Sequence, residues 1–298
     1  MKVGYACINR SMDCRSSRTF RLKNYTEKKL IETVQGNLDC LMKILEYNIK
    51  NNIFFFRITS DLIPFASHPV MQFKWQDHFK STFKNIGNFI KDYGMRITMH
   101  PGQYTFLNSH NEEVYRNAIK DLEYHVDLID LMGLESTAKV QIHVGGVYGD
   151  KEKSIWRFVE KYNKLEDKIK KRLIIENDDR SYNLNDCLLI SHQVKIPIVF
   201  DIYHHSCYNN GESLTEAFDS FIKTWHFEDG IPIVHYSSEH HIKGKSKHAE
   251  FIDLPHFKKF IKSTKNYDFD IMLEIKDKET SALKAIDIIK SDSRFNRN

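Results

Sequence analysis

The strongest constraint on the fold is an alternation of short β-rich runs with longer helical patterns, which recurs eight times along the 298 residues. Each run has the length of one strand, and the segments between runs repeat apolar residues at the spacing of one helix face. Strands that alternate with helices form right-handed βαβ units and a parallel sheet. The eight runs are residues 3–8, 53–59, 96–100, 139–144, 173–177, 196–201, 231–236 and 270–275.

The helical patterns indicate one helix in each gap between runs. One pattern starts at Leu30 after a plausible cap at Thr26, two others run up to Gly94 and Gly133, and a fourth spans residues 155–169. Eight βα units in a chain of this length fit a (β/α)8 barrel, the TIM barrel of the α/β class. A doubly wound open sheet is the alternative.

The composition is that of a globular protein, with 41% hydrophobic and 28% charged residues. No linker rich in Pro, Gly or Ser divides the sequence, so we expect a single domain over residues 1–298. No apolar run approaches the roughly 20 residues that a membrane-spanning helix needs. Arg10 and Asp13 interrupt the N-terminal apolar stretch before it reaches signal-peptide length, so we expect a cytoplasmic protein.

The cysteines give no sign of a disulfide framework or of a structural zinc site. They are five in number, an odd count, and no two are spaced as a CxxC pair. We therefore expect all of them to be reduced. They are Cys7, Cys14, Cys40, Cys187 and Cys207.

Six successive runs end on, or carry near their end, a residue type that binds metal ions. These residues are His100, His143, Glu176, Asp201, His235 and Glu274. The carboxyl ends of barrel strands converge on one face, so side chains that are far apart in the sequence meet there. A single His or acidic residue at a strand end more often forms a structural hydrogen bond or caps a helix. Six such residues at the ends of six successive strands are not explained by chance.

Three carboxylates gathered at one face would repel one another, and divalent cations remove that cost. Mixed His and carboxylate ligands suit zinc, manganese or iron better than calcium or magnesium. A carboxylate that bridges two ions holds them about 3.5 to 4 Å apart, the spacing used for displacement at phosphorus. The pattern therefore favours phosphodiester hydrolysis.

Two basic segments follow strands and so belong to the same face as these residues. Residues 10–23 hold Arg10, Arg15, Arg18, Arg21 and Lys23 against one acid, a net charge of +4 that equals the formal net charge of the whole chain. Residues 238–248 add Lys243, Lys245 and Lys247 against one acid. A basic rim around a hydrolytic centre is what binding to a phosphate backbone requires. A solvated loop with incidental charge is the alternative for either segment alone.

Seven motifs, taken in order, resemble the UV damage endonuclease family. They are GY (4–5), SDLIPFASHP (60–69), HPGQY (100–104), HVGG (143–146), END (176–178), FDIYHH (200–205) and LEIKDK (273–278). The resemblance extends from residue 1 to about residue 280. It implies a DNA repair endonuclease on a TIM barrel similar to endonuclease IV. Such an enzyme hydrolyses the phosphodiester bond immediately 5′ of a UV photoproduct without ATP, leaving a 3′-hydroxyl and a 5′-phosphate.

The resemblance also implies a cluster of two or three divalent ions, with manganese as the metal. His100, His143 and Glu176 match one site, Glu176, Asp201, His235 and Glu274 match a second, and His204 and His248 match ligands of a third. Glu176 and Glu274 would act mainly as ligands, with a general-base role secondary. The family commonly has a lysine, which can be carboxylated, where this chain has Ile233. We expect activity to be retained, because none of the eight ligands is lost.

Other residues are assigned to DNA by the same resemblance. Gln103 and Tyr104 would probe the duplex at a distorted step, because an amide beside an aromatic ring can enter where opening costs least. Tyr5 and Asn9 would contact the lesion or its partner bases. His68 would contact phosphate or order a metal-bound water. Packing of Tyr104 within its loop and a turn cap at His68 are the alternatives.

Three other functions share parts of this pattern. An abasic-site endonuclease of the endonuclease IV type would have the same metals and fold, and the loop with Gln103 and Tyr104 discriminates against it. A metal-dependent sugar isomerase would have no need of a basic rim. A noncatalytic DNA-damage binding module would not require a His-rich metal cluster. We expect UV-damaged double-stranded DNA as the partner, no membrane, no nucleotide cofactor and a monomer.

Overall fold

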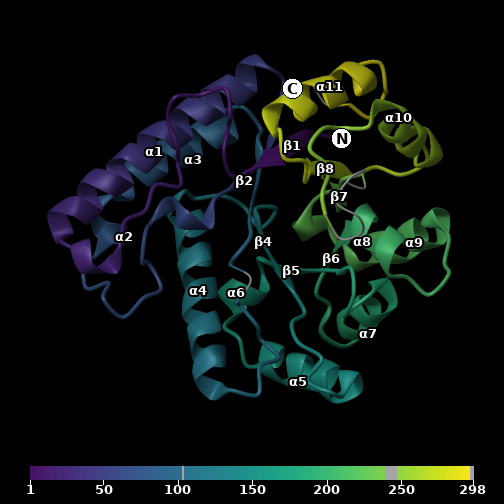
Figure 1. Cartoon of the computed structure of the whole chain (residues 1–298), viewed down its shortest axis with the longest axis horizontal. Coiled ribbons are helices and arrows are strands. Elements are labelled where there is room, and N and C mark those ends of the chain that lie inside the picture. Colours follow the sequence, from purple (N-terminus) through teal and green to yellow (C-terminus); the bar gives the residue numbers. More distant parts are fainter. Residues whose placement is uncertain (103, 239–246, 296–298) are drawn as a thin grey trace.

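A computed structural model describes residues 1–102, 104–238 and 247–295. Across these residues, eight parallel strands form a closed barrel in sequence order (Figure 1). The strands are β1 (Val3–Ala6), β2 (Phe55–Ile58), β3 (Arg96–Met99), β4 (Lys139–His143), β5 (Leu173–Glu176), β6 (Ile198–Asp201), β7 (Ile233–Tyr236) and β8 (Asp270–Leu273). The expected (β/α)8 barrel is confirmed. The open-sheet alternative is wrong, because β8 pairs with β1 through Ile271 and Val3.

The helices form the outer layer around the barrel (Figure 1). They are α1 (Glu27–Lys50), α2 (Trp75–His78), α3 (Lys80–Asp92), α4 (Glu112–Leu131), α5 (Lys151–Asn163), α6 (Asp167–Lys170), α7 (Leu184–Val194), α8 (Ile202–Cys207), α9 (Leu214–Phe221), α10 (Leu254–Ser263) and α11 (Glu279–Ile289). Short 3-10 helices are η1 (Leu22–Asn24), η2 (Ser60–Leu62), η3 (Ile222–Thr224) and η4 (Phe227–Asp229). No helix of the described residues is both long and apolar enough to cross a membrane.

The expectation of one helix per gap is wrong after β2, β4 and β6, where two α-helices follow each strand. The pattern over residues 155–169 is the clearest case. The chain leaves the helix at Lys164 and re-enters one at Asp167, yet Leu165 stays buried between them. Apolar spacing marks which residues face the barrel, and it continues through a turn that keeps the same face buried.

The helix boundaries that the sequence marks with caps are confirmed. The Thr26 hydroxyl accepts a hydrogen bond from the backbone N–H of Lys29 at 3.1 Å, which satisfies a free donor at the start of α1. Gly94 and Gly133 follow α3 and α4 with φ angles of 57° and 64°. Residues with a Cβ rarely adopt this left-handed conformation, so glycine ends both helices.

One expectation about the cysteines is wrong. Cys14 and Cys40 are joined by a disulfide bond, which links the loop after β1 to the middle of α1. Cys7, Cys187 and Cys207 are free thiols, as expected. The sequence separation of 26 residues gave no hint of the pairing, because the two cysteines meet only when the loop folds back over the helix.

Candidate metal centre and DNA-binding face

The ends of six strands bring the candidate ligands to one face, which we call the mouth of the barrel. His143, Glu176 and Asp201 are the last residues of β4, β5 and β6. The strand register places His143 beside Glu176 and Asp201 beside His235. His100 and Glu274 follow directly after β3 and β8. The parallel register of the barrel therefore sets these side chains at one level.

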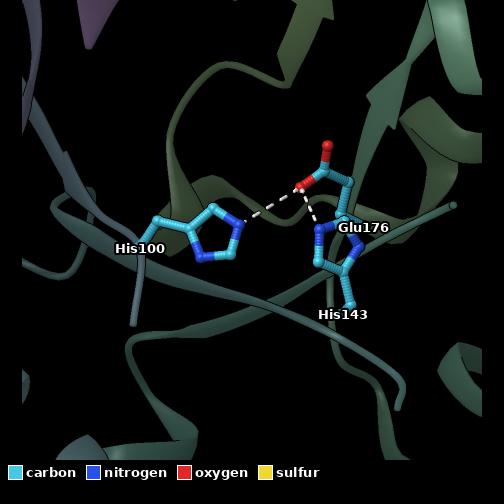
Figure 2. Close-up of side chains that lie close together, drawn as sticks. All are labelled: His100, His143 and Glu176. Atoms are coloured by element: carbon cyan, nitrogen blue, oxygen red, sulfur yellow. Dashed lines mark ion pairs between the residues drawn. The ribbon is translucent and has the colours of Figure 1, made fainter. Parts of the chain in front are cut away.

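The first group consists of His100, His143 and Glu176 (Figure 2). Both imidazoles point toward the same carboxylate oxygen, with Oε2 of Glu176 lying 3.8 Å from Nε2 of His100 and 3.7 Å from Nε2 of His143. Nδ1 of His100 donates a hydrogen bond to the carbonyl of Pro101 at 2.9 Å. This bond fixes the ring and leaves Nε2 as the unprotonated nitrogen that can act as a ligand.

The second group consists of Glu176, Asp201, His235 and Glu274, whose candidate ligand atoms all lie within 4.8 Å of one another. Oε1 of Glu176 is 2.8 Å from Nδ1 of His235, and Oε1 of Glu274 is 3.3 Å from the same nitrogen. Glu176, Asp201 and His235 are fully buried, or nearly so. Glu176 belongs to both groups, with one carboxylate oxygen facing each.

His204 and His248 lie against these two groups. Nδ1 of His204 is 3.6 Å from Oε1 of Glu176 and 3.7 Å from Oδ2 of Asp201. Nε2 of His248 is 3.5 Å from Oε2 of Glu274, and the rings of His204 and His248 are 5.8 Å apart. The structure thus brings together all eight residues that the sequence suggested as metal ligands.

The electrostatics of the cluster follow from burial and from the pairing of acids with imidazoles. Burial raises the pKa of Asp201. Burial opposes ionisation of Glu176 as well, but the nearby His235 and His143 hold the pKa of that carboxyl below its usual value. Burial and the neighbouring His143 lower the pKa of His100 to about 3. Burial disfavours the charged form of His204 too, yet Asp201 and Glu176 raise its pKa to about 10.

Some buried polar atoms of the cluster lack a hydrogen-bond partner among the described residues, and a bound cation would satisfy such a cluster. Oδ2 of Asp201 and Nδ1 of His143 are buried and have no hydrogen-bond partner among the described residues. Buried polar atoms are rarely left in this way. The donor set of imidazole nitrogens and carboxylate oxygens suits divalent transition metals. The clustered residues can therefore hold divalent metal ions.

Sequence reasoning missed two buried polar residues beneath the cluster, Arg57 on β2 and Gln141 on β4. Arg57 is 5% exposed and Gln141 is fully buried. A signal was present in both strands. Arg57 interrupts the apolar sequence of β2, and Gln141 lies two residues before His143, so period-2 alternation turns it to the same side.

The basic residues of the loop after β1 lie at the protein surface. Arg10, Arg15, Arg18 and Arg21 are all exposed, and so is Lys247 in the segment after β7. Lys243 and Lys245 lie outside the described residues. Every described member of the predicted basic rim is therefore exposed, and its contact with DNA stays a prediction.

The remaining DNA-contact residues differ in exposure. The Tyr104 side chain is 85% exposed in the loop after β3, whereas its neighbour Gln103 lies outside the described residues. Tyr5 and Asn9 are buried, and the Tyr5 hydroxyl accepts a hydrogen bond from Asn9 at 2.9 Å. The Tyr5 hydroxyl also donates to Asn48 at 2.7 Å, so protein groups satisfy it fully. A lesion-contact role for Tyr5 and Asn9 therefore stays a prediction.

Two further positions complete the comparison with the sequence. His68 is exposed, and its Nδ1 accepts a hydrogen bond from the backbone N–H of Val70 at 3.0 Å, which matches the turn-cap alternative. Ile233 is fully buried in the hydrophobic core, two residues before His235 on β7. An apolar side chain thus stands where the resemblance led us to expect a lysine.

The closed barrel and its mouth of imidazoles and carboxylates define a TIM-barrel enzyme with a centre able to bind metal ions. A sequence model of the family described as UV-endonuclease UvdE matches residues 1–297. The chain belongs to this family, and membership makes it an endonuclease of the DNA repair class.

Relatives and solved structures agree with this assignment. A UV DNA damage endonuclease of Clostridium perfringens is 44% identical over 97% of this chain and 71% of its own length. The crystal structure of SacUVDE is similar with a TM-score of 0.93 and 45% identity, covering 98% of both chains. Endonuclease IV from Thermus thermophilus has a TM-score of 0.60 at 14% identity, covering 85% of this chain and 93% of its own. The last similarity concerns the fold.

Proposed function

We propose that this endonuclease hydrolyses the phosphodiester bond immediately 5′ of UV photoproducts in double-stranded DNA, using a polynuclear metal cluster and no ATP or other nucleotide cofactor. The observation that carries the proposal is Glu176, whose two carboxylate oxygens face two separate groups of candidate ligands. A shared carboxylate is how two ions are held at the spacing used in phosphodiester hydrolysis. The names of the relatives, UV DNA damage endonucleases, support the choice of substrate.

The ligand assignment follows the three sets of contacts. His100 and His143 would hold one ion with Glu176, and Asp201, His235 and Glu274 would hold a second with the same carboxylate. His204 and His248 would complete a third site, and we propose manganese as the metal. When bound, such ions supply Lewis-acid activation of water and stabilisation of charge at phosphorus.

The protein's own residues would bind and orient the substrate. Arg15, Arg18 and Arg21 are exposed in the loop after β1, and their positive charge would attract the phosphate backbone without reading its sequence. Tyr104 projects into solvent, where its ring can stack on a base at a distorted step. Gln103 would fill the vacated pairing position, Lys243, Lys245 and Lys247 would extend the basic rim, and His68 would contact phosphate.

Other expectations remain part of the proposal. We propose a single domain over residues 1–298, supported by strands of one barrel that run from Val3 to Leu273. A monomer and a cytoplasmic location also stay predictions. The family assignment favours an endonuclease over a sugar isomerase or a noncatalytic binding module.

The decisive experiment incubates the purified protein with labelled duplexes that carry one cyclobutane pyrimidine dimer, one abasic site or no lesion. We expect Mn²⁺-dependent nicking next to the dimer on its 5′ side, without ATP, and none after chelation with EDTA. E176Q should lose cleavage by at least about 100-fold while its fold is preserved, because one oxygen of the bridge becomes an amide nitrogen. Cleavage at the abasic site alone would decide for the endonuclease IV type of activity. A near-normal rate for E176Q would refute the shared-ligand assignment.

A further inference from the structure

Arg57, on β2, lies beneath the ligand cluster and contacts it from inside the barrel. Nη1 donates to Oε1 of Glu274 at 2.6 Å, and Nη2 donates to Nε2 of His235 at 2.8 Å. Nη2 also donates to Oε1 of Gln141 at 3.2 Å. A single guanidinium on β2 therefore binds residues from β4, β7 and the segment after β8.

Gln141 extends this contact to the shared carboxylate. Its Nε2 donates to Oε2 of Glu176 at 3.0 Å, while its Oε1 accepts from Arg57. Through Gln141 the guanidinium fixes the orientation of Glu176, and directly it fixes Glu274. These are two of the four residues of the second ligand group.

The geometry of the guanidinium is suited to this task. Its planar fork offers several donors at fixed angles, so it can hold two or three acceptors in one arrangement. Buried against the carboxylate of Glu274 and close to that of Glu176, it also places one permanent positive charge beside them.

We propose that Arg57, acting with Gln141, is a positioning residue that holds the carboxylates of Glu274 and Glu176 in the arrangement needed to bind metal. This inference rests on the proposed function, because it assumes that the second group binds a metal ion. Residues that orient metal ligands typically change metal affinity or activity by about 10- to 100-fold when they are replaced.

The chain contains a matched control in Arg96. It is also buried on a neighbouring strand, and its Nη1 lies 2.7 Å from Oδ2 of Asp270 on β8, at the opposite end of the barrel. Arg57 pairs with Glu274, directly after β8, and Arg96 pairs with Asp270, the first residue of β8. Of these two arginines, Arg57 alone contacts candidate ligands. A purely structural role would affect both variants alike.

The experiment measures Mn²⁺ affinity by isothermal titration calorimetry and thermal unfolding by circular dichroism for wild type, R57Q, R57K, Q141L and R96Q. We expect R57Q and R57K to bind Mn²⁺ at least about tenfold more weakly, since one ammonium cannot hold all three partners. Q141L, which keeps the shape of the side chain, should weaken binding in the same direction. R96Q should lower the melting temperature and leave the Mn²⁺ affinity within about twofold of wild type.

The outcomes separate this inference from the proposed function. A wild-type protein that does not bind Mn²⁺ would overturn both. The positioning role alone would be overturned if the wild type binds Mn²⁺ and R57Q and Q141L bind it with the same affinity. It would also be overturned if R57K binds Mn²⁺ as tightly as the wild type. If R57Q fails to fold, Q141L decides by itself. On damaged duplex, we expect R57Q to lower kcat with little change in KM, because Arg57 lies beneath the cluster and away from the DNA-binding surface.

Discussion

Cys14 and Cys40 are joined by a disulfide that ties the basic loop over residues 10–23 to helix α1. A second link lies close by, where the backbone N–H of Arg18 donates to Oδ1 of Asn37 at 2.9 Å and the Asn37 amide donates back to the Arg18 carbonyl at 3.0 Å. Both links fasten the loop to the same face of α1. The basic loop is therefore attached to α1 at two places, Cys14 and Arg18.

We expect C14S and C40S to lower both stability and DNA affinity. A cross-link that closes a loop of 26 residues restricts the unfolded chain and stabilises the folded state by about 3.5 kcal/mol. The freed loop would also have to become ordered on binding, which weakens affinity. Urea unfolding and DNA titration with and without a dithiol reductant test this. C207S, which replaces a free thiol, is the control. If C14S has the same stability and DNA affinity as C207S, the disulfide has no role in either property.

The exposed arginines of the same loop should set the salt dependence of DNA binding. We expect the triple variant R15Q/R18Q/R21Q to bind duplex DNA more weakly and to reduce the slope of log K against log salt concentration by up to about 2.7, which is about 0.9 for each lost phosphate contact. The measurement is fluorescence anisotropy at several concentrations of NaCl.

A triple variant that removes the same charge from the other end of the barrel is the control for this loss. Lys171, Lys195 and Lys223 are exposed. Lys171 and Lys195 lie between a helix and the strand that follows it, and Lys223 lies in η3, after α9 and before β7, so all three belong to the face opposite the mouth. K171Q/K195Q/K223Q should leave the salt slope close to that of wild type. An equal reduction in both triple variants would show that net charge, rather than the basic loop, governs binding.

Tyr104 should contribute to the recognition of damage and not to the metal centre. We expect Y104A to weaken binding to a damaged duplex by about 1 to 3 kcal/mol, the range found for stacking of one base on an aromatic ring, with unchanged metal content. Phe227, which is 97% exposed in η4 before β7, provides a matched aromatic control at the opposite end of the barrel. Loss of metal in Y104A, or equal loss of affinity in F227A, would show that the ring has another role.

Six of the eight candidate ligands could be predicted because each lies at or next to a strand end, whereas His204, in α8, and His248 were suggested by the family resemblance. A parallel barrel brings such positions together whatever the loops do, so the spacing of Glu176 and His235 in the sequence is unimportant. Arg57 could not be assigned in the same way. Its partners lie on β4, β7 and after β8, and only the closed barrel shows which side chains meet beneath the mouth.

The disulfide and the extra helices were missed for a related reason. Cys14 reaches Cys40 because a loop folds back on α1, and local sequence patterns do not encode such a path. The division of the pattern over residues 155–169 into α5 and α6 depends on a turn that leaves the apolar face continuous. Apolar periodicity therefore predicts burial more reliably than it predicts helix ends.

His125 should make the stability of the protein depend on pH below neutrality. Its ring is fully buried in α4, where Nδ1 donates to the carbonyl of Asp121 at 2.6 Å and Nε2 has no hydrogen-bond partner among the described residues. Burial lowers the pKa of His125 below its usual value of 6.5. The unfolded chain therefore binds a proton at a pH where the folded protein does not, and the free energy of unfolding falls as the pH drops through about 6.5.

We expect H125Q to reduce this pH dependence even if it lowers stability overall. Loss of one differential proton removes up to about 1.4 kcal/mol per pH unit from the slope between pH 6.5 and pH 5. Urea unfolding at several pH values in EDTA measures the slope. L122A, a buried and non-titrating change in the same helix, should lower stability equally at every pH. A slope in H125Q equal to that of wild type would mean that His125 takes up its proton in the folded protein as readily as in the unfolded chain.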